Sequence, residues 1–587
     1  MLKFLKYLLA TILGTFLTFL IIFFIIIGIA SASQSKEPIT VKNNSIIKIS
    51  LTKIIQERQP LNPLAEFGIN TDEGIQGLNK IKASIKAAKN DTKIKGIYLD
   101  AGTFTGGGLA TIEEIRNALI DFKTSGKFVV AYGENYNQKA YYLSTAANKI
   151  YLNPMGLVDF KGLYAQVMFF KNAMNKLDIE MQIIRGPGNK FKSAVEPFLL
   201  DHMSEANKEQ TEVFIGSIWK NLLNKISESR KIPSETLQEI ANELITYDAT
   251  AAKKAGMVDD NFYWHQVESK LKEFTKIDET KKLNFISLAD YSQTVRKINR
   301  KAKKKIAIIY ASGNIESGEG DDQTIGSDRI VKAIRKARKD SSIVAIVLRV
   351  NSPGGSAQAS EVIFQELMLT KNVKPLVVSM GDLAASGGYY ISCLADKIYA
   401  QPNTITGSIG VFGMIPNIHN FVTNKLGITF DGVKTAHNAD IITSIEPLTP
   451  FQTEVIRHSI DNIYKTFIGH VAEGRNMTTE AVDSIGQGRV WSGTDALKIG
   501  LVDELGGIDK AITTAAELAN TTNYKIVELP TLTNPLDKLL KQIGSKTSIE
   551  AAVKDNLGAY AKYYEFFRTL NTSDLYQARL PYIIDIQ

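Results

Sequence analysis

Cysteine is almost absent from this chain, with one residue, Cys393, among 587. A single cysteine cannot form an internal disulfide, so the fold must depend on its hydrophobic cores. The surrounding segment YYISCLADKIYA is largely apolar, and we therefore expect a buried, inert thiol. The sequence excludes a scaffold held together by disulfides.

A strong excess of one charge is also missing, since the formal net charge is only +8 and the pI about 9.0. No zinc finger, RNA-recognition signature or basic–aromatic stripe occurs, so we expect no nucleic-acid partner. Much of the excess lies within 296–305, which we interpret as a solvated linker, with contact to anionic lipid heads as the alternative. The 44% hydrophobic and 22% charged residues exclude a disordered or fibrous protein, and the length suggests two to four domains.

Near the N-terminus charge is absent altogether, from Tyr7 to Ser35, and residues 8–29 are almost wholly apolar. At ~1.5 Å per residue this run makes a helix about 33 Å long, enough to cross a ~30 Å hydrocarbon core. Lys3 and Lys6 precede it, which favours a cytoplasmic N-terminus. We predict a membrane anchor over 1–35. A cleaved signal peptide is the alternative, because Ala30-Ser31-Ala32 has the small residues of a cleavage site.

The remaining chain contains an internal duplication. Residues 93–154 and 342–402 share one order of features: an apolar strand, a glycine-rich turn (TGGG or SPGG), a helix, a second strand, a YY[LI]S segment and a short strand ending in Lys-Ile-Tyr. AVEPF at 194–198 likewise parallels SIEPL at 444–448, and TAAKKAGMVDD parallels TDALKIGLVDE. Strands that alternate with helices predict an α/β fold with a largely parallel sheet in each copy. The predicted boundaries are 45–290 for repeat one, 291–305 for the basic linker, 306–528 for repeat two and 529–587 for a tail with an amphipathic helix in AYAKYYEFFRTL.

Features present in only one copy are candidates for function. Aligned on the tyrosine pairs, Ser386 of AASGGYYIS faces Gln138 of repeat one. Small neighbours at a strand-to-helix corner expose a serine Oγ and let a substrate approach. The alternative is a purely structural role, in which the serine caps the helix that follows. The amides of Gly354 or Gly355 in the SPGG turn, together with that of Gly387, are candidates for an oxyanion hole.

A nucleophilic serine needs a base. None of the six histidines lies in a recognisable triad motif, and we interpret them as surface or core residues. Lys192 of NKFKSAVEPF stands three residues before Val195, where repeat two has Ile442. We take this exchange of lysine for isoleucine as a sign of a semi-buried site, where the neutral amine is favoured and can accept a proton. A surface lysine with its stem along apolar neighbours is the alternative.

Together these motifs resemble the signal peptide peptidase A (protease IV) family in its long two-repeat form. NKFKSAVEPF, NSPGG, MGDLAASGGYYIS and TGSIGVFG occur in the right order across about residues 45–528. The resemblance implies two tandem Clp-protease/crotonase-like repeats after an N-terminal transmembrane helix, and a serine endopeptidase. It implies Ser386 as nucleophile, Lys192 as base and Ser408 as the residue that orients the lysine, with no cofactor or metal.

The resemblance further implies a homotetramer on the bacterial inner membrane, with its catalytic portion on the periplasmic side, that degrades cleaved signal peptides. Because the lysine must be neutral to act, we expect an activity optimum on the alkaline side. Two other functions stay open: a crotonase-type acyl-CoA enzyme, with Asp382 as the acid closest to Ser386 in sequence, and an inactive membrane-tethered scaffold.

Overall fold

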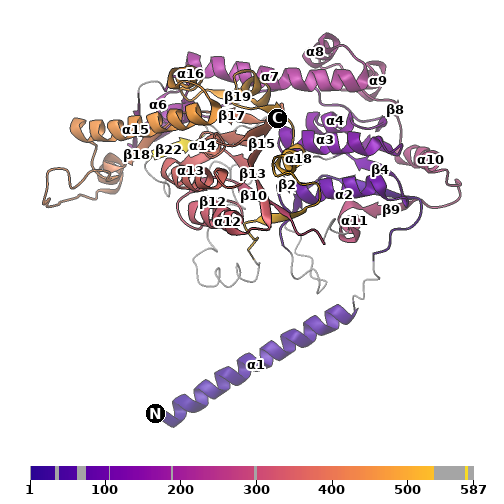
Figure 1. Cartoon of the computed structure of the whole chain (residues 1–587), viewed down its shortest axis with the longest axis horizontal. Helices are drawn as coiled ribbons and strands as arrows, with labels where there is room; N and C mark the ends of the chain where they lie inside the picture. Colours follow the sequence, from indigo (N-terminus) through magenta and orange to yellow (C-terminus); the bar gives the residue numbers. More distant parts are fainter. Residues whose placement is uncertain are drawn as a thin grey trace.

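A computed structural model describes residues 2–33, 39–61, 74–102, 104, 106–186, 189–295, 301–533 and 576–579. Figure 1 shows one helix, α1 (Leu2–Ser33), lying apart from a folded body of sheets covered by helices. Described apolar side chains of α1 are exposed, among them Phe4, Phe16 and Phe19. Within the described part of the chain, no helix combines the length and the apolarity needed to cross a membrane. The predicted anchor therefore rests on the sequence alone.

The first sheet takes all its strands from repeat one. Its six strands run in the order β8-β6-β5-β4-β1-β9, and every neighbouring pair is parallel. This agrees with the predicted parallel sheet, in which the central strand β5 is buried along its whole length. The strands are β1 (Ser45–Ser50), β4 (Ile94–Asp100), β5 (Phe128–Gly133), β6 (Lys149–Leu152), β8 (Asp260–Asn261) and β9 (Asn284–Ser287).

Repeat two builds its sheet in the same order, β20-β16-β15-β13-β10-β21, again with parallel pairs. Two further strands extend it beside β15: β17, which is parallel to β15, and β19, which is antiparallel to β17. The strands are β10 (Lys305–Ser312), β13 (Ile343–Ser352), β15 (Leu376–Ala385), β16 (Lys397–Ala400), β17 (Ile405–Gly407), β19 (Val490–Ser492), β20 (Glu504–Leu505) and β21 (Lys525–Leu529).

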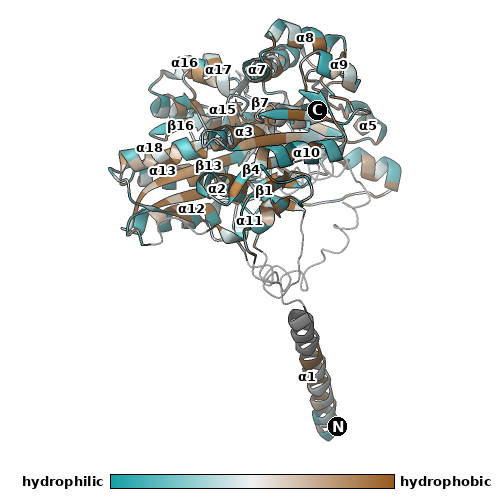
Figure 2. Cartoon of the chain, turned by 90° about the vertical axis from the view of Figure 1, so that its right-hand side faces the viewer, coloured by the Kyte–Doolittle hydropathy of each residue, from teal (hydrophilic) through white to brown (hydrophobic). Residues whose placement is uncertain are grey.

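Helices repeat as closely as strands do, and Figure 2 shows their hydrophilic faces turned outward from hydrophobic strands. Three pairs have equal lengths of 13, 15 and 26 residues. The longest pair begins at hydroxyl N-caps, Ser204 and Thr449, and ends at left-handed C-caps, Lys231 and Asn476. The pairs are α2 (Leu78–Asn90) with α12 (Ser327–Lys339), α3 (Leu109–Lys123) with α13 (Ala357–Lys371), and α7 (Glu205–Arg230) with α15 (Pro450–Arg475).

The shorter elements complete both repeats. They are β2 (Ile54–Gln56), β3 (Ile75–Gly77), α4 (Gln138–Ser144), α5 (Lys171–Lys176), the 3₁₀ helix η2 (Ser193–Val195), α6 (Glu196–Leu199), α8 (Ser234–Asn242), α9 (Ala249–Lys254), α10 (Trp264–Thr275), α11 (Leu288–Thr294), α14 (Gly387–Tyr390), η3 (Phe421–Lys425), α16 (Thr479–Ile485), α17 (Gly493–Lys498) and α18 (Ile508–Leu518). Cys393 follows α14 and is fully buried, as expected, and burial raises the pKa of its thiol to about 12.

A third sheet joins the two repeats in the order β12-β11-β14-β22-β18-β7. Strand β7 comes from repeat one and pairs antiparallel with β18 of repeat two over six residues each. Strand β22 comes from the C-terminal tail, whose predicted amphipathic helix lies outside the described residues. The strands are β7 (Glu180–Arg185), β11 (Ile315–Glu316), β12 (Ile325–Gly326), β14 (Gly354–Ser356), β18 (Phe412–Asn417) and β22 (Tyr576–Arg579).

Candidate active site

Ser386 stands at the corner between β15 and α14, as the sequence predicts. Its φ of 56° and ψ of −114° are unusual for a residue with a Cβ, and a backbone of this kind costs about 1–3 kcal/mol. Ser386 occupies the N-cap position of α14, yet its side chain makes no capping hydrogen bond. The structure therefore argues against the capping role. A strained turn that holds a serine at the end of a strand is typical of nucleophiles.

Lys192 reaches Ser386 from the other repeat. Its Nζ lies 2.9 Å from Ser386 Oγ, although the two residues are 194 positions apart in sequence. The pairing of β7 with β18 brings this about, because Lys192 follows β7 in the chain and Ser408 lies between β17 and β18. All three side chains are fully buried.

Burial decides the protonation state of Lys192. An ammonium group loses its hydration when it is buried, and this lowers the pKa of Lys192 well below its ordinary value. Lys192 Nζ lies 3.0 Å from both the carbonyl oxygen and Oγ of Ser408. A neutral amine has two N–H groups for these oxygens, which leaves its lone pair for the Ser386 hydroxyl. The arrangement suits a base at Lys192.

The three glycines of the predicted oxyanion hole do not face the same way. A Cβ on Gly354 (φ +98°) would lie 2.1 Å from the carbonyl oxygen of Ala578 in β22 and 2.8 Å from the amide nitrogen of Gly387. A Cβ on Gly355 would instead lie 2.1 Å from the carbonyl oxygen of Ile315 in β11. Gly354 and Gly387 thus border one space beside Ser386, whereas Gly355 allows close packing against β11.

In repeat one the corresponding turn is occupied by a side chain of repeat two. Asp382 accepts hydrogen bonds from the amides of Gly108 and Thr111, at 3.2 and 2.9 Å, and from Thr111 Oγ1 at 2.6 Å. A Cβ on Gly108 would lie 2.4 Å from the Asp382 carboxyl carbon. Asp382 is therefore a bridge between the repeats.

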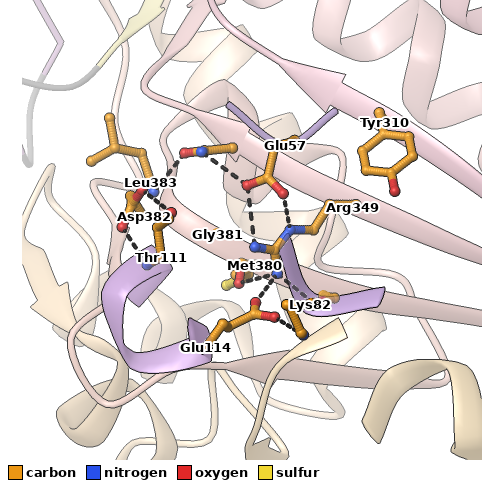
Figure 3. Close-up of polar contacts among 12 residues, drawn as sticks. Glu57, Lys82, Thr111, Glu114, Tyr310, Arg349, Met380, Gly381, Asp382 and Leu383 are labelled. Atoms are coloured by element: carbon orange, nitrogen blue, oxygen red, sulfur yellow. Dashed lines mark hydrogen bonds and ion pairs between the residues drawn. The ribbon is translucent and has the colours of Figure 1, made fainter. Parts of the chain in front are cut away.

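A buried network of charges joins the repeats beside this bridge (Figure 3). Arg349 of β13 donates to both carboxylate oxygens of Glu57, at 2.8 and 3.1 Å, and lies 2.7 Å from Glu114 of α3. Lys82 forms an ion pair with Glu114. Burial alone would raise the pKa of Glu114, but the charges of Arg349 and Lys82 lower it to about 2. Since Glu57, Glu114 and Lys82 belong to repeat one, the network ties both repeats together next to the site.

Three residues that support Lys192 were missed by the sequence analysis. Gln210 of α7 donates to the carbonyl of Phe191 and to Ser193 Oγ, both at 2.9 Å, and accepts from the amide of Val490 in β19. Asn189 donates to the carbonyl of Val411 at 3.0 Å. Gly488 packs on Lys192, since a Cβ there would lie 2.6 Å from the lysine Cα. The helix pairing offers one signal, because Gln210 corresponds to Val455 when α7 and α15 are aligned on their caps.

One step of the sequence argument for Lys192 was wrong. The sequence predicts a semi-buried position at Ile442, but this residue is 48% exposed and its φ is 65°. The segment before Glu446 in repeat two therefore does not copy the buried segment before Glu196. Lys192 is buried where Ser386, Ser408 and Gly488 of repeat two lie against it, and no local exchange in the sequence reveals this.

Comparison with known proteins identifies the family. Peptidase family S49 matches over residues 121–278 and 368–522, once in each repeat. Protease 4 of Haemophilus influenzae is 39% identical over 74% of this chain and 72% of its own length, and Protease 4 of Salmonella typhi is 41% identical over 78% and 75%. Serine protease SPPA, chloroplastic, of Arabidopsis thaliana is 33% identical over 80% and 70%. The chain therefore belongs to peptidase family S49, and it is a serine peptidase.

Proposed function

We propose that this peptidase works by a serine–lysine dyad split between the repeats, with Ser386 as nucleophile and Lys192 as general base. The distance of 2.9 Å between Lys192 Nζ and Ser386 Oγ carries the proposal. The lowered pKa of the buried lysine supports it, because only a neutral amine can take the serine proton.

The reaction follows from these positions. Lys192 Nζ accepts the hydroxyl proton as Ser386 Oγ attacks the scissile carbonyl carbon. Backbone amides near Gly354 and Gly387 stabilise the negative oxygen that forms. Lys192 then protonates the leaving amine, and water hydrolyses the acyl-enzyme. Ser408 holds the lysine in place through its carbonyl and hydroxyl oxygens.

The alternative functions have less support. A crotonase-type reaction needs an acid free to act near the hole, but the Asp382 carboxylate is held by Thr111 and Gly108. An inactive scaffold has no use for a strained serine beside a buried lysine, since both cost stability.

For substrate and location we propose hydrophobic peptides, cleaved signal peptides among them, at a bacterial inner membrane. The support is the uncharged run from Tyr7 to Ser35, with Lys3 and Lys6 before it, which suits a single-pass anchor with the catalytic portion outside the cytoplasm. We also propose a homotetramer, as the resemblance to the family implies. Retention in the membrane pellet after alkaline carbonate extraction tests the anchor, and release of the full-length chain counts against it.

The dyad is tested by a serine-reactive acylating probe, such as a fluorophosphonate, with the site read by peptide mass spectrometry. We expect labelling at Ser386 in the wild type, none in Ser386→Ala, and much slower labelling in Lys192→Ala. The control is Ser144→Ala, a buried serine of repeat one, which should label as the wild type does. Labelling elsewhere, or unchanged labelling of Lys192→Ala, counts against the dyad.

A further inference from the structure

A glutamate–tyrosine pair occurs in both repeats. In repeat one, the hydroxyl of Tyr142 in α4 donates a hydrogen bond to Glu113 of α3. In repeat two, the hydroxyl of Tyr390 in α14 donates one to Glu361 of α13. The positions are equivalent, because each tyrosine is the second of its YY[LI]S segment and each glutamate is the fifth residue of a 15-residue helix. A pair that both copies share belongs to the architecture of the fold.

Repeat two adds a histidine to this pair. His470 of α15 places its Nε2 3.0 Å from Glu361 Oε2. Its ring stacks on that of Phe364 with the centroids 4.0 Å apart, and it meets the ring of Tyr390 edge-on at 5.5 Å. The imidazole is thus held on two sides, with its Nε2 beside the carboxylate that also accepts from Tyr390.

The histidine donates this hydrogen bond whether or not it is charged. Burial alone would raise the pKa of Glu361, but hydrogen bonds, first that of His470, lower it to about 2. An ionised carboxylate can only accept hydrogen bonds, so Nε2 of the histidine carries a hydrogen. A neutral imidazole with its hydrogen on Nε2 keeps the contact. The contact therefore persists at the alkaline pH at which a neutral Lys192 acts.

The counterpart of His470 in repeat one has a different partner. When α7 and α15 are aligned on their caps, Lys225 stands at the position of His470. Its Nζ forms an ion pair with Glu228 at 3.0 Å, and burial raises the pKa of Glu113. The histidine therefore completes the cluster only in the repeat that carries Ser386, which makes it a candidate for function.

The cluster is joined to Ser386 through α14. The amide of Tyr390 donates to the carbonyl oxygen of Ser386 at 2.8 Å, and the amide of Ile391 donates to that of Gly387 at 3.1 Å. This helix has only four residues, and so short a helix depends on tertiary contacts for its stability. What holds Tyr390 therefore also holds the strained backbone of Ser386 and the amide of Gly387.

From these contacts we propose that His470 and Glu361 are positioning residues for the peptidase reaction. They hold the Tyr390 end of α14, which keeps the Ser386 hydroxyl and the Gly387 amide aligned for attack on the scissile carbonyl. The inference rests on the proposed function of Ser386, and neither His470 nor Glu361 touches the reacting atoms. Their loss should therefore lower kcat and leave KM unchanged.

Steady-state hydrolysis of a short hydrophobic peptide ester by the full-length chain in detergent tests the proposal. His470→Phe keeps a stacked ring without the donor, and kcat should fall by about 10-fold or more, because small misplacements of reacting groups slow a reaction strongly. KM should stay within about twofold of the wild-type value. His470→Gln restores an N–H donor at a similar position and should keep kcat within about threefold of the wild type.

The tyrosine pair supplies a matched control. Tyr390→Phe and Tyr142→Phe each remove one hydroxyl from a glutamate. Tyr142→Phe should lower the midpoint of thermal unfolding at least as much as Tyr390→Phe, because Glu113 is more deeply buried than Glu361. Only Tyr390→Phe should lower kcat, again by about 10-fold. A loss of stability alone then does not account for the loss of rate.

Ser386→Ala in the same assay separates this inference from the function on which it rests. If hydrolysis does not depend on Ser386, the proposed dyad fails and the positioning role fails with it. If hydrolysis depends on Ser386 but His470→Phe keeps the wild-type kcat, the positioning role is refuted and the dyad stands. Equal losses in His470→Phe and His470→Gln, a raised KM with an unchanged kcat, or an equal fall of kcat in Tyr142→Phe would each overturn the positioning role.

Discussion

The two repeats build the same sheet from strands in the same order, but they differ at the end of one strand. In repeat one, β5 stops at Gly133 after six residues. Its counterpart β15 runs for ten residues to Ala385, and its last three pair with the added strand β17. The extension holds Ser386 next to Ser408, which follows β17.

The glycine-rich turns differ in the same way. That of repeat one is filled by the carboxylate of Asp382, whereas that of repeat two faces the main-chain carbonyl of Ala578. One copy of the turn thus serves the contact between repeats, and the other serves the site. A duplicated fold can thus divide architecture from chemistry between its copies, although in the proposed mechanism repeat one still contributes the base, Lys192.

The largest expected effect on activity distinguishes Ser386 from Gln138, its counterpart in repeat one. Ser386→Ala should lower kcat/KM for a peptide ester by at least about 10⁴-fold, because it removes the proposed nucleophile. Gln138→Ala should keep the activity and lose only stability, since the Gln138 amide bonds the backbone at Gly162. Steady-state kinetics and thermal unfolding of both variants check this. Equal losses of activity in the two variants would contradict the division of structural and catalytic roles between the repeats.

The next effect concerns the charge network between the repeats. Arg349→Met should lower the free energy of unfolding by about 3–5 kcal/mol, because Glu57 keeps a buried charge without a cationic partner and Glu114 keeps only Lys82. Lys208→Met is the control, since its ion pair with Glu205 has side chains 55% and 91% exposed, and it should cost less than about 0.5 kcal/mol. Urea unfolding measures the free energy of unfolding of both variants. If Arg349→Met costs as little as Lys208→Met, the network does not stabilise the contact between the repeats.

A smaller effect separates two glycines with similar backbones. Gly354→Ala places a Cβ where the substrate carbonyl is expected, and we expect kcat/KM to fall by about 10²–10³-fold. Gly126→Ala in repeat one introduces the same kind of strain at φ +80° but meets no atom within 4 Å, so activity should persist. If Gly354→Ala keeps its activity, the carbonyl binds elsewhere.

The smallest effect concerns Ser408, which positions Lys192. Ser408→Ala removes one of two hydrogen-bond acceptors, a loss of about 0.5–1.5 kcal/mol, which corresponds to about a 2- to 13-fold fall in kcat/KM. The acidic limb of the pH profile should move as well, because the lysine changes its surroundings. Ser144→Ala, a buried serine of repeat one, should move neither value. If the acidic limb of the pH profile is unchanged in Ser408→Ala, Ser408 does not position Lys192.

Much of this could be read from the sequence. Strand-turn-helix order and repeated motifs predicted two parallel sheets and a corner at Ser386, because these features are local. Pairing between distant strands leaves no local pattern, and so β7 with β18, the Asp382 bridge and the return of β22 were not predicted. The resemblance to the family pointed to Lys192 more securely than did its comparison with Ile442, which proved to be an exposed loop residue.

The proposed mechanism requires that a neutral lysine of repeat one accepts the proton of a serine of repeat two, and the pH dependence of hydrolysis measures this requirement. The kcat/KM of the wild type, Lys192→Ala and Ser386→Ala would be measured on one peptide ester from pH 5 to 10. Burial lowers the pKa of Lys192, so the wild-type rate should rise with pH as the amine loses its proton and should level off well below pH 10.5. Lys192→Ala should lose this limb and about 10²–10⁴-fold of the rate, and Ser386→Ala should be inactive throughout. A Lys192→Ala variant that keeps the wild-type rate and profile would contradict the split dyad.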